Sequence, residues 1–212
     1  LDWRELFTDP QLQALIEKGL ENNTDLRTAH LRVQEAEAAL MTSRLAYLPA
    51  LNLTPQGTIS SFDGSKAAKS YQLAASASWE IDIFGRLTNA KRSAQAALEQ
   101  TKSYKQAVRT QLIATIANSY YTLLLLDKQL VISERTASLW KENVQAMQAL
   151  KKAGLANEAA VSQSEANSLS VEASLLTLRQ QINEMENSLS NLLGEVPQRV
   201  ERGNLDLSLI HI

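Results

Sequence analysis

Two carboxylates stand close together near the middle of the chain, at Glu80 and Asp82. Paired carboxylates can catalyse hydrolysis as a general acid and a general base, provided that a dry pocket raises the pKa of one of them. The sequence around these two residues supplies neither a pocket signature nor a third catalytic group. We therefore do not expect an enzyme, and the positions of both carboxylates must be explained by the elements that carry them.

Other reactive or metal-binding groups are sparse. The chain has no cysteine and only two histidines, His30 and His211, so neither a zinc site nor a reactive thiolate is expected. No Gly-rich sequence follows Gly85, which we expect to permit a sharp turn and not to bind phosphate. The net charge of −2 offers no basic surface for nucleic acid. We predict no cofactor, no metal and no nucleic-acid partner.

The two carboxylates end a stretch that has the period of a β-strand. In residues 70–83 the odd positions are almost all apolar and the even positions almost all polar, while residues 51–62 show a weaker form of the same alternation. Asp63-Gly64 and the polar residues up to Lys69 predict the turn of a hairpin. Strands of about 9–11 residues are long enough to cross a membrane when tilted.

A membrane hairpin would place its odd face against lipid and its even face in water. The lipid-facing candidates are Tyr71, Leu73, Trp79 and Ile81. The lumen-facing candidates are Gln72, Ser76, Ser78, Glu80 and Asp82. Aromatic residues at both ends of the second strand are typical of membrane interfaces. Two alternatives stay open: a surface hairpin whose odd face lies on a soluble core, and carboxylates that cap the next helix or neutralise Arg86 and Lys91.

Long helices flank the hairpin. Helical periodicity starts at Thr8-Asp9-Pro10, resumes from about residue 25 to 47, and then runs over 87–153 and 157–193. Apolar and small residues recur at alternating spacings of three and four, which is the pattern of a coiled-coil seam. Gly154 and Gly194 are expected to end the last two helices in left-handed conformations. No run of 18 apolar residues predicts a membrane-spanning helix.

Neither part is complete by itself. Two strands cannot close a barrel, and an open sheet edge is not tolerated in lipid. A helix of about 65 residues, roughly 100 Å long, cannot be buried on both faces by a chain of this length. Both parts therefore predict neighbouring copies or repeats arranged around an axis.

Several motifs resemble the bacterial outer-membrane efflux proteins, the TolC-like exit ducts of tripartite efflux and secretion systems. The resemblance covers about residues 3–197. It rests on the order and spacing of Trp3…Phe7-x-Asp9-Pro10-x-Leu12…Leu15-Ile16, Asn23-x-Asp25-Leu26…Ala29…Arg32…Ala36, Leu48-Pro49-x-Leu51, Trp79-Glu80-Ile81-Asp82-Ile83-Phe84-Gly85-Arg86, Ala117-x-x-Tyr120…Leu126-Asp127-x-Gln129-Leu130, Gly154-Leu155-Ala156 and Asn191-Leu192-Leu193-Gly194. Only the first of the family's two tandem repeats is represented.

The resemblance implies a mainly α-helical fold with a β-hairpin, in which the long coiled-coil helices form part of a periplasmic α-barrel and the two strands join a trimeric outer-membrane β-barrel. It implies a homotrimer in contact with outer-membrane lipid, a periplasmic adaptor and an inner-membrane pump. The candidates for adaptor contact are Gly154, Leu155 and Ala156, and the plain alternative is a Gly-capped turn. Gate residues belong mainly to the second repeat, so none is assigned.

We accordingly expect five segments. They are N-terminal helices at 1–48, the membrane hairpin at 49–84, the long helical hairpin at 85–196, the start of a linker at 197–206, and a non-native tail at 207–212, whose sequence matches one reading frame of a transposon-end sequencing adapter. The expected function is a passive exit duct for drugs or other small molecules. A soluble helical periplasmic adaptor or scaffold is the main alternative, followed by a pore-forming toxin.

Overall fold

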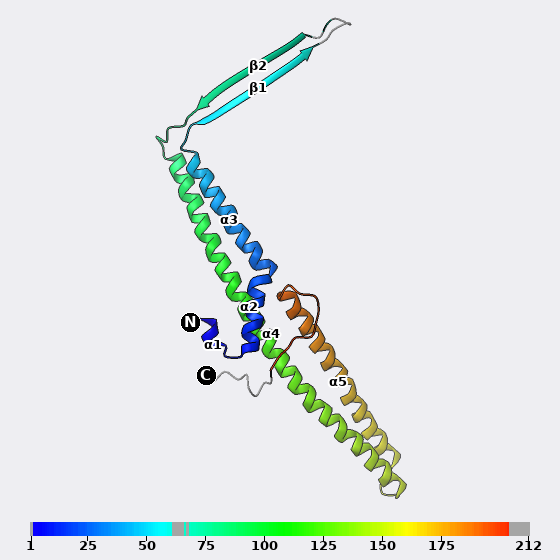
Figure 1. Ribbon diagram of the computed structural model, residues 1–212. Coiled ribbons are helices and arrows are strands. Elements are labelled where there is room, and N and C mark those ends of the chain that lie inside the picture. Colours follow the sequence, from blue (N-terminus) through cyan, green and yellow to red (C-terminus); the bar gives the residue numbers. More distant parts are fainter. Residues whose placement is uncertain (1, 61–65, 67, 204–212) are drawn as a thin grey trace. The chain divides into compact units, whose positions relative to one another are not determined.

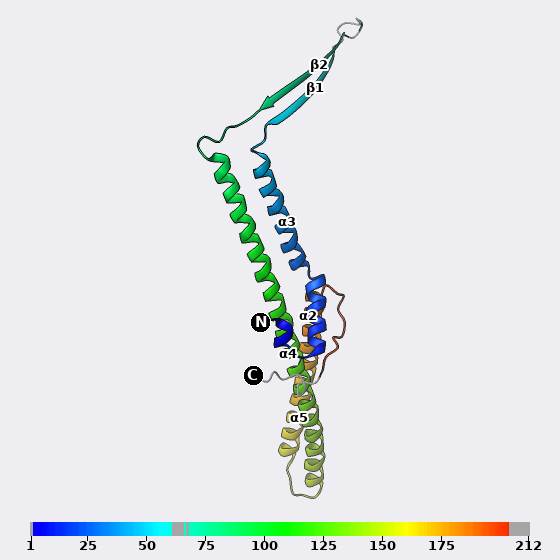
Figure 2. The ribbon, with the colours of Figure 1, turned by 60° about the vertical axis from the view of Figure 1, so that its left-hand side comes forward.

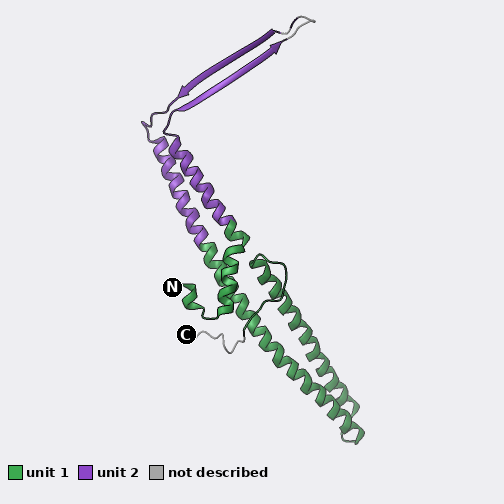
Figure 3. Ribbon diagram, in the orientation of Figure 1, with its two compact units in different colours: residues 1–27, 107–212 green, residues 28–106 purple. Residues whose placement is uncertain are grey.

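The computed structural model describes residues 2–60, 66 and 68–203. The elements, in order, are α1 (Trp3–Leu6), α2 (Pro10–Asn22), α3 (Thr24–Leu45), β1 (Ala50–Ser60), β2 (Ala68–Ser78), α4 (Arg86–Lys152) and α5 (Glu158–Leu192) (Figure 1). They fall into two compact units, coloured in Figure 3: residues 1–27 with 107–212, and residues 28–106. The long helix α4 contributes to both units.

The first unit is a helical bundle with one apolar core. Figures 1 and 2 show α5 beside the C-terminal half of α4. The core joins α2, α4 and α5 through Leu12, Ile16, Ile116, Leu123 and Leu189, all of them completely buried. The apolar seams predicted along α4 and α5 face inward over their full length, because every seam residue is buried or partly buried. Helical periodicity thus correctly identified the packing faces of both helices.

Local sequence signals set the helix ends. The Asp9 carboxylate accepts from the backbone N–H of Gln11 at 2.9 Å, and Pro10 occupies the first turn of α2. The side chain of Asn157 caps α5 by accepting from the N–H of Ala160 at 2.9 Å. The predicted left-handed glycines are confirmed, with φ of 75° at Gly154 and 69° at Gly194.

The second unit contains most of α3, the hairpin and the start of α4. Val33 and Leu40 of α3 pack against Leu98 of α4, with Ala36 and Ala94 beside them. These small side chains allow the two helix backbones to approach closely, in agreement with the coiled-coil pattern predicted for the helix from about residue 25 to 47. None of the helices in the described part of the chain is both apolar enough and long enough to cross a membrane.

The strands pair in antiparallel register, from Ala50 opposite Ser78 to Ser60 opposite Ala68. The predicted second strand of 70–83 was therefore too long at its end. The chain before Ala50 is the turn that leaves α3, so residues after Ser78 have no strand with which to pair. The short helix α1, which begins after its N-cap residue Asp2, was not predicted. The expected turn at Asp63-Gly64 and the tail at 207–212 lie outside the described residues.

Candidate functional site

The register of the hairpin places all the odd-numbered residues of both strands on one face. Directly opposed residues of an antiparallel pair share a face. The odd-face pairs are Leu51 with Ala77, Leu53 with Ala75, Pro55 with Leu73, Gly57 with Tyr71 and Ile59 with Lys69. The even-face pairs include Asn52 with Ser76, Gln56 with Gln72 and Thr58 with Ser70. The hairpin thus has one mainly apolar face, with Lys69 at the turn end, and one mainly polar face.

None of the described residues of the second unit covers either face of this hairpin. Every residue of β1 and β2 is exposed, and Tyr71 and Leu73 retain 77% and 69% of their accessible surface. A soluble hairpin would instead bury its apolar row on its own helices. The ring of Tyr71 lies over Gly57, where an added Cβ would lie 3.5 Å from its Cδ1. This cross-strand contact covers a gap on the apolar face.

The two carboxylates that follow the hairpin bind the start of α4. Asp82 accepts hydrogen bonds from the backbone N–H groups of Leu87 and Thr88, both at 2.9 Å, and from the Thr88 hydroxyl at 2.6 Å. Glu80 forms a two-pronged ion pair with the Arg86 guanidinium. The junction alternative therefore describes the contacts that Glu80 and Asp82 make within the chain. Their exposure to a lumen remains a prediction.

Aromatic side chains surround the same junction. The Trp79 indole N–H donates to the backbone carbonyl of Tyr47 at 3.1 Å, which ties the end of β2 to the turn after α3. Trp79, Ile81, Ile83 and Phe84 stay exposed, and Phe84 keeps 95% of its surface. Gly85, which was expected to permit a sharp turn, adopts a φ of 72°, so the turn into α4 uses a left-handed conformation.

The turn between α4 and α5 is short and capped at both ends. The N–H of Leu155 donates to the carbonyl of Leu150 at 2.9 Å and that of Gly154 to Lys151 at 3.0 Å, which is a Schellman-type end. Lys151 and Glu158 form an ion pair across the turn. Leu155 is 77% exposed. The turn therefore offers an exposed leucine on a fixed backbone.

A buried ionic cluster holds the segment that follows α5. The guanidinium of Arg202 is only 8% exposed and makes two hydrogen bonds to Asp127, at 2.5 and 2.9 Å, and a third to Glu186. The hydrogen bonds to Asp127 raise the pKa of Arg202 further above its usual value, so the residue stays cationic. The family motif contained Asp127, but no local pattern marks Glu186 or Arg202 as its partners.

A second polar contact lies beside this cluster. The hydroxyl of the completely buried Tyr120 donates to Asp9 at 2.7 Å and accepts from the N–H of Gly203 at 3.1 Å. Burial, reinforced by the bond to Asp9, raises the pKa of Tyr120 to about 12. The motif residues Asp9 and Tyr120, which are 111 positions apart, thus form a direct contact that anchors the segment after α5.

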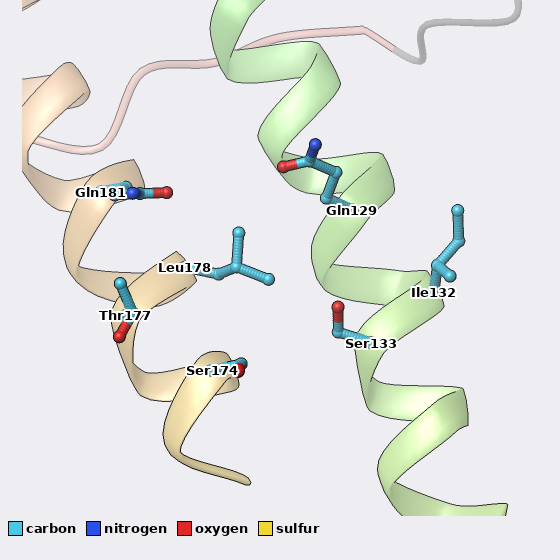
Figure 4. A pocket seen from close by; sticks show the side chains of 7 residues that line it. All are labelled: Gln129, Ile132, Ser133, Ser174, Thr177, Leu178 and Gln181. Carbon is cyan, nitrogen blue, oxygen red and sulfur yellow. The ribbon is translucent and has the colours of Figure 1, made fainter. Parts of the chain in front are cut away.

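A groove of about 470 Å3 lies between α4 and α5. Figure 4 shows Leu178 pointing from α5 toward α4, Ser133 and Gln129 pointing back, and Ile132 pointing away. Only neutral side chains line this groove, so it provides no titratable acid or base. Within residues 2–60, 66 and 68–203, no three acidic, histidine or cysteine side chains gather as they would around a metal ion.

Sequence comparison shows that proteins similar to this chain are outer membrane components of efflux and export systems. The family described as outer membrane efflux protein matches residues 15–195. The cation efflux system protein CusC of Escherichia coli K12 is 30% identical over 194 residues, covering 91% of this chain and 42% of CusC. The pyoverdine export outer membrane protein OpmQ of Pseudomonas aeruginosa is 29% identical, covering 94% of this chain and 44% of OpmQ.

The structural comparison agrees. The outer-membrane channel OprN superposes with a TM-score of 0.83 and 26% identity, covering 98% of this chain and 48% of OprN. The chain therefore spans less than half the length of each of these relatives. Since the family match extends over most of the residues, and the helices and hairpin occur in the same order, this chain belongs to the outer membrane efflux protein family.

Proposed function

We propose that this chain supplies part of the wall of an outer-membrane channel, which serves as the passive exit duct of a tripartite efflux system. The observation that carries the proposal is the hairpin: 11 paired positions with one apolar face, one polar face and no cover on either. Such a hairpin gains its missing burial when lipid covers the apolar face and neighbouring strands pair with its edges.

Within this proposal each face has a defined environment. Tyr71 and Leu73 contact lipid, while Trp79 and Ile81 lie at the interface where the hairpin meets the helices. Gln72, Ser76 and Ser78 face the aqueous lumen. Glu80 and Asp82 lie at the end of the lumen, where they also fix the start of α4.

The helices supply the second part of the duct, as an α-barrel built with neighbouring copies. Besides its buried seam, α4 carries exposed Leu125, Ile132 and Leu139 at intervals of seven residues. On α5, Leu169 and Leu176 repeat the same interval. A second apolar stripe on a helix that already has a packed seam indicates contact with another helix. These stripes support packing against helices of other copies, and in the proposed duct those copies form a homotrimer that spans the periplasm.

The turn between α4 and α5 is the proposed contact with one of two partner proteins. Gly154, Leu155 and Ala156 contact a periplasmic adaptor protein, through the exposed Leu155 side chain and the small neighbours that allow a helical hairpin to approach. An inner-membrane pump supplies the energy, and the duct conducts small molecules passively.

Conductance measurements test the duct. The protein is expressed from its natural locus, purified in detergent and added to planar bilayers, where discrete channel openings are expected. A protein that stays monodisperse without detergent and never conducts would instead be a soluble scaffold.

A matched pair of charges tests the assignment of the faces. Leu73→Lys places a cation on the apolar face, where it costs about 2–4 kcal/mol at the membrane midplane, while Gln72→Lys places the same cation on the polar face. We expect outer-membrane levels to fall sharply for Leu73→Lys alone. Equal losses for both variants would contradict the assignment.

A further inference from the structure

The junction of the hairpin and the helices contains a groove of about 600 Å3 within the second unit. It is lined by Arg44, Tyr47, Thr88, Lys91, Arg92 and Gln95. Three of these six side chains are cationic, and none is acidic. The groove lies at the end of α3 and in the first three turns of α4, immediately beside the segments that lead into and out of the hairpin.

The three cations have no carboxylate partner among the residues that the structure describes, since no ion pair joins Arg44, Lys91 or Arg92 to an acidic side chain. The nearby acids are engaged elsewhere: Glu80 pairs with Arg86, and Asp82 accepts three hydrogen bonds from Leu87 and Thr88. The positive charge of the groove is therefore not neutralised by the part of the chain that surrounds it.

The base of the groove is held rigidly. The Tyr47 hydroxyl donates to Thr88 Oγ1 at 3.1 Å, and Thr88 in turn donates to Asp82. The ammonium of Lys91 lies 6.0 Å from the centre of the Tyr47 ring, within the range of a cation–π contact. The Trp79 indole fixes the backbone of Tyr47 from the other side. The groove therefore combines fixed polar atoms with three cations.

We infer that this groove binds the phosphate of an anionic phospholipid, in the leaflet from which the helices emerge. The inference rests on the proposed function, which places the helix end of the hairpin at a membrane surface. Exposed Trp79, Ile83 and Phe84 next to the groove are suited to the acyl and headgroup boundary. Basic residues at such a surface attract anionic headgroups, and arginine matches the geometry of phosphate oxygens.

The test compares two triple variants with the same loss of charge. Arg44→Gln/Lys91→Gln/Arg92→Gln removes the cations of the groove. The control, Arg32→Gln/Lys102→Gln/Lys105→Gln, removes one cation from α3 and two from α4, roughly 15–20 Å farther along the helices from the hairpin. Each protein, expressed from its natural locus, is reconstituted in phosphatidylcholine vesicles with and without phosphatidylglycerol. Bound lipid is then identified by native mass spectrometry, and circular dichroism checks that each variant is folded.

We expect the wild type to retain phosphatidylglycerol in preference to phosphatidylcholine. Retention should weaken about fivefold for each groove cation, which amounts to roughly 100-fold in the triple variant. It should stay unchanged in the control. Equal retention by the groove variant, or an equal loss in the control, overturns the inference. Displacement of the lipid by millimolar inorganic phosphate would show that the site takes free phosphate, which also overturns it.

Conductance of the same vesicles separates this inference from the proposed function. A wild type that conducts but shows no preference for phosphatidylglycerol defeats only the lipid site. A wild type that conducts in neither lipid mixture defeats the proposed duct and the lipid site together.

Discussion

The helical core of the first unit and the hairpin of the second show two ways in which a periodic sequence can be stabilised. Leu12, Ile116 and Leu189 meet inside the chain and are completely buried. Leu51, Leu53 and Leu73 form an equally regular row, yet all three are exposed. Regular apolar rows are therefore buried inside the fold in one region and left exposed in the other. Periodicity indicates which residues share a face, but only the structure shows what covers it.

The largest contrast should appear between truncations in the two regions. Ile116→Ala leaves a cavity in the core and should lower the free energy of unfolding by about 3 kcal/mol. Leu73→Ala removes an exposed side chain and should change it by less than about 0.5 kcal/mol in detergent-free buffer with denaturant. Denaturation followed by circular dichroism at helical wavelengths measures both variants. Similar losses would mean that the hairpin is packed against protein after all.

The ionic cluster gives the next effect. Arg202→Met keeps much of the side-chain volume but leaves Glu186 buried without its cation, which should cost about 3 kcal/mol of unfolding free energy. Adding Glu186→Gln to this variant removes the buried negative charge and should recover part of the loss. The recovery distinguishes a charge effect from lost packing. The same denaturation curves are used, and a double variant no more stable than Arg202→Met would refute the charge explanation.

Close packing of α2 against α4 gives a smaller effect. A Cβ added at Gly19 would lie 2.4 Å from Cδ1 of Ile116, so Gly19→Ala should destabilise the core by about 1–2 kcal/mol. Ile116→Val deletes the clashing methyl group. The double variant should therefore be more stable than the sum of the two single losses predicts. Strict additivity in thermal or chemical melts would show that the helices simply move apart.

A further effect is a dependence on alkaline pH, and it appears only in strongly basic solution. The folded pKa of Tyr120 is about 12, above the value of about 10 expected in the unfolded chain. The folded state thus binds this proton more tightly, so the contribution of Tyr120 is fully present below pH 10 and is lost as the pH rises toward 12. Tyr120→Phe should lose this part of the pH dependence. The difference between the ultraviolet titrations of the wild type and of Tyr120→Phe should show a tyrosine that ionises with a pKa of about 12.

Most of the helical fold could be predicted from the sequence because its signals are local. Asn157, Gly154 and Gly194 mark helix ends by their own conformational preferences, and the seams follow from spacing alone. The end of β2 could not be predicted in this way. Residues 79–83 keep the alternation of a strand, but whether they pair depends on Ala50, where the opposite strand begins.

The candidate sites also differ in whether a local sequence pattern marks them. The alternation of β2 identified the two faces that the register then confirmed, as for Tyr71 opposite Gly57. The contacts of Arg202 with Asp127 span 75 positions, and no local pattern marks such a pairing. The cationic groove likewise combines Arg44 of α3 with Lys91 of α4, which only the packing of the two helices brings together.

The antiparallel ladder has a consequence for changes in the length of the hairpin. Each added pair of residues lengthens a strand by about 6.6 Å and returns its side chains to the same sides. A balanced insertion of two residues in β1 and two in β2 therefore extends the hairpin without altering the helices, because the anchors at Trp79 and Asp82 lie beyond the ladder. An insertion of a single residue would invert every side chain beyond it. Evolution can thus change the height of this segment only in steps of two.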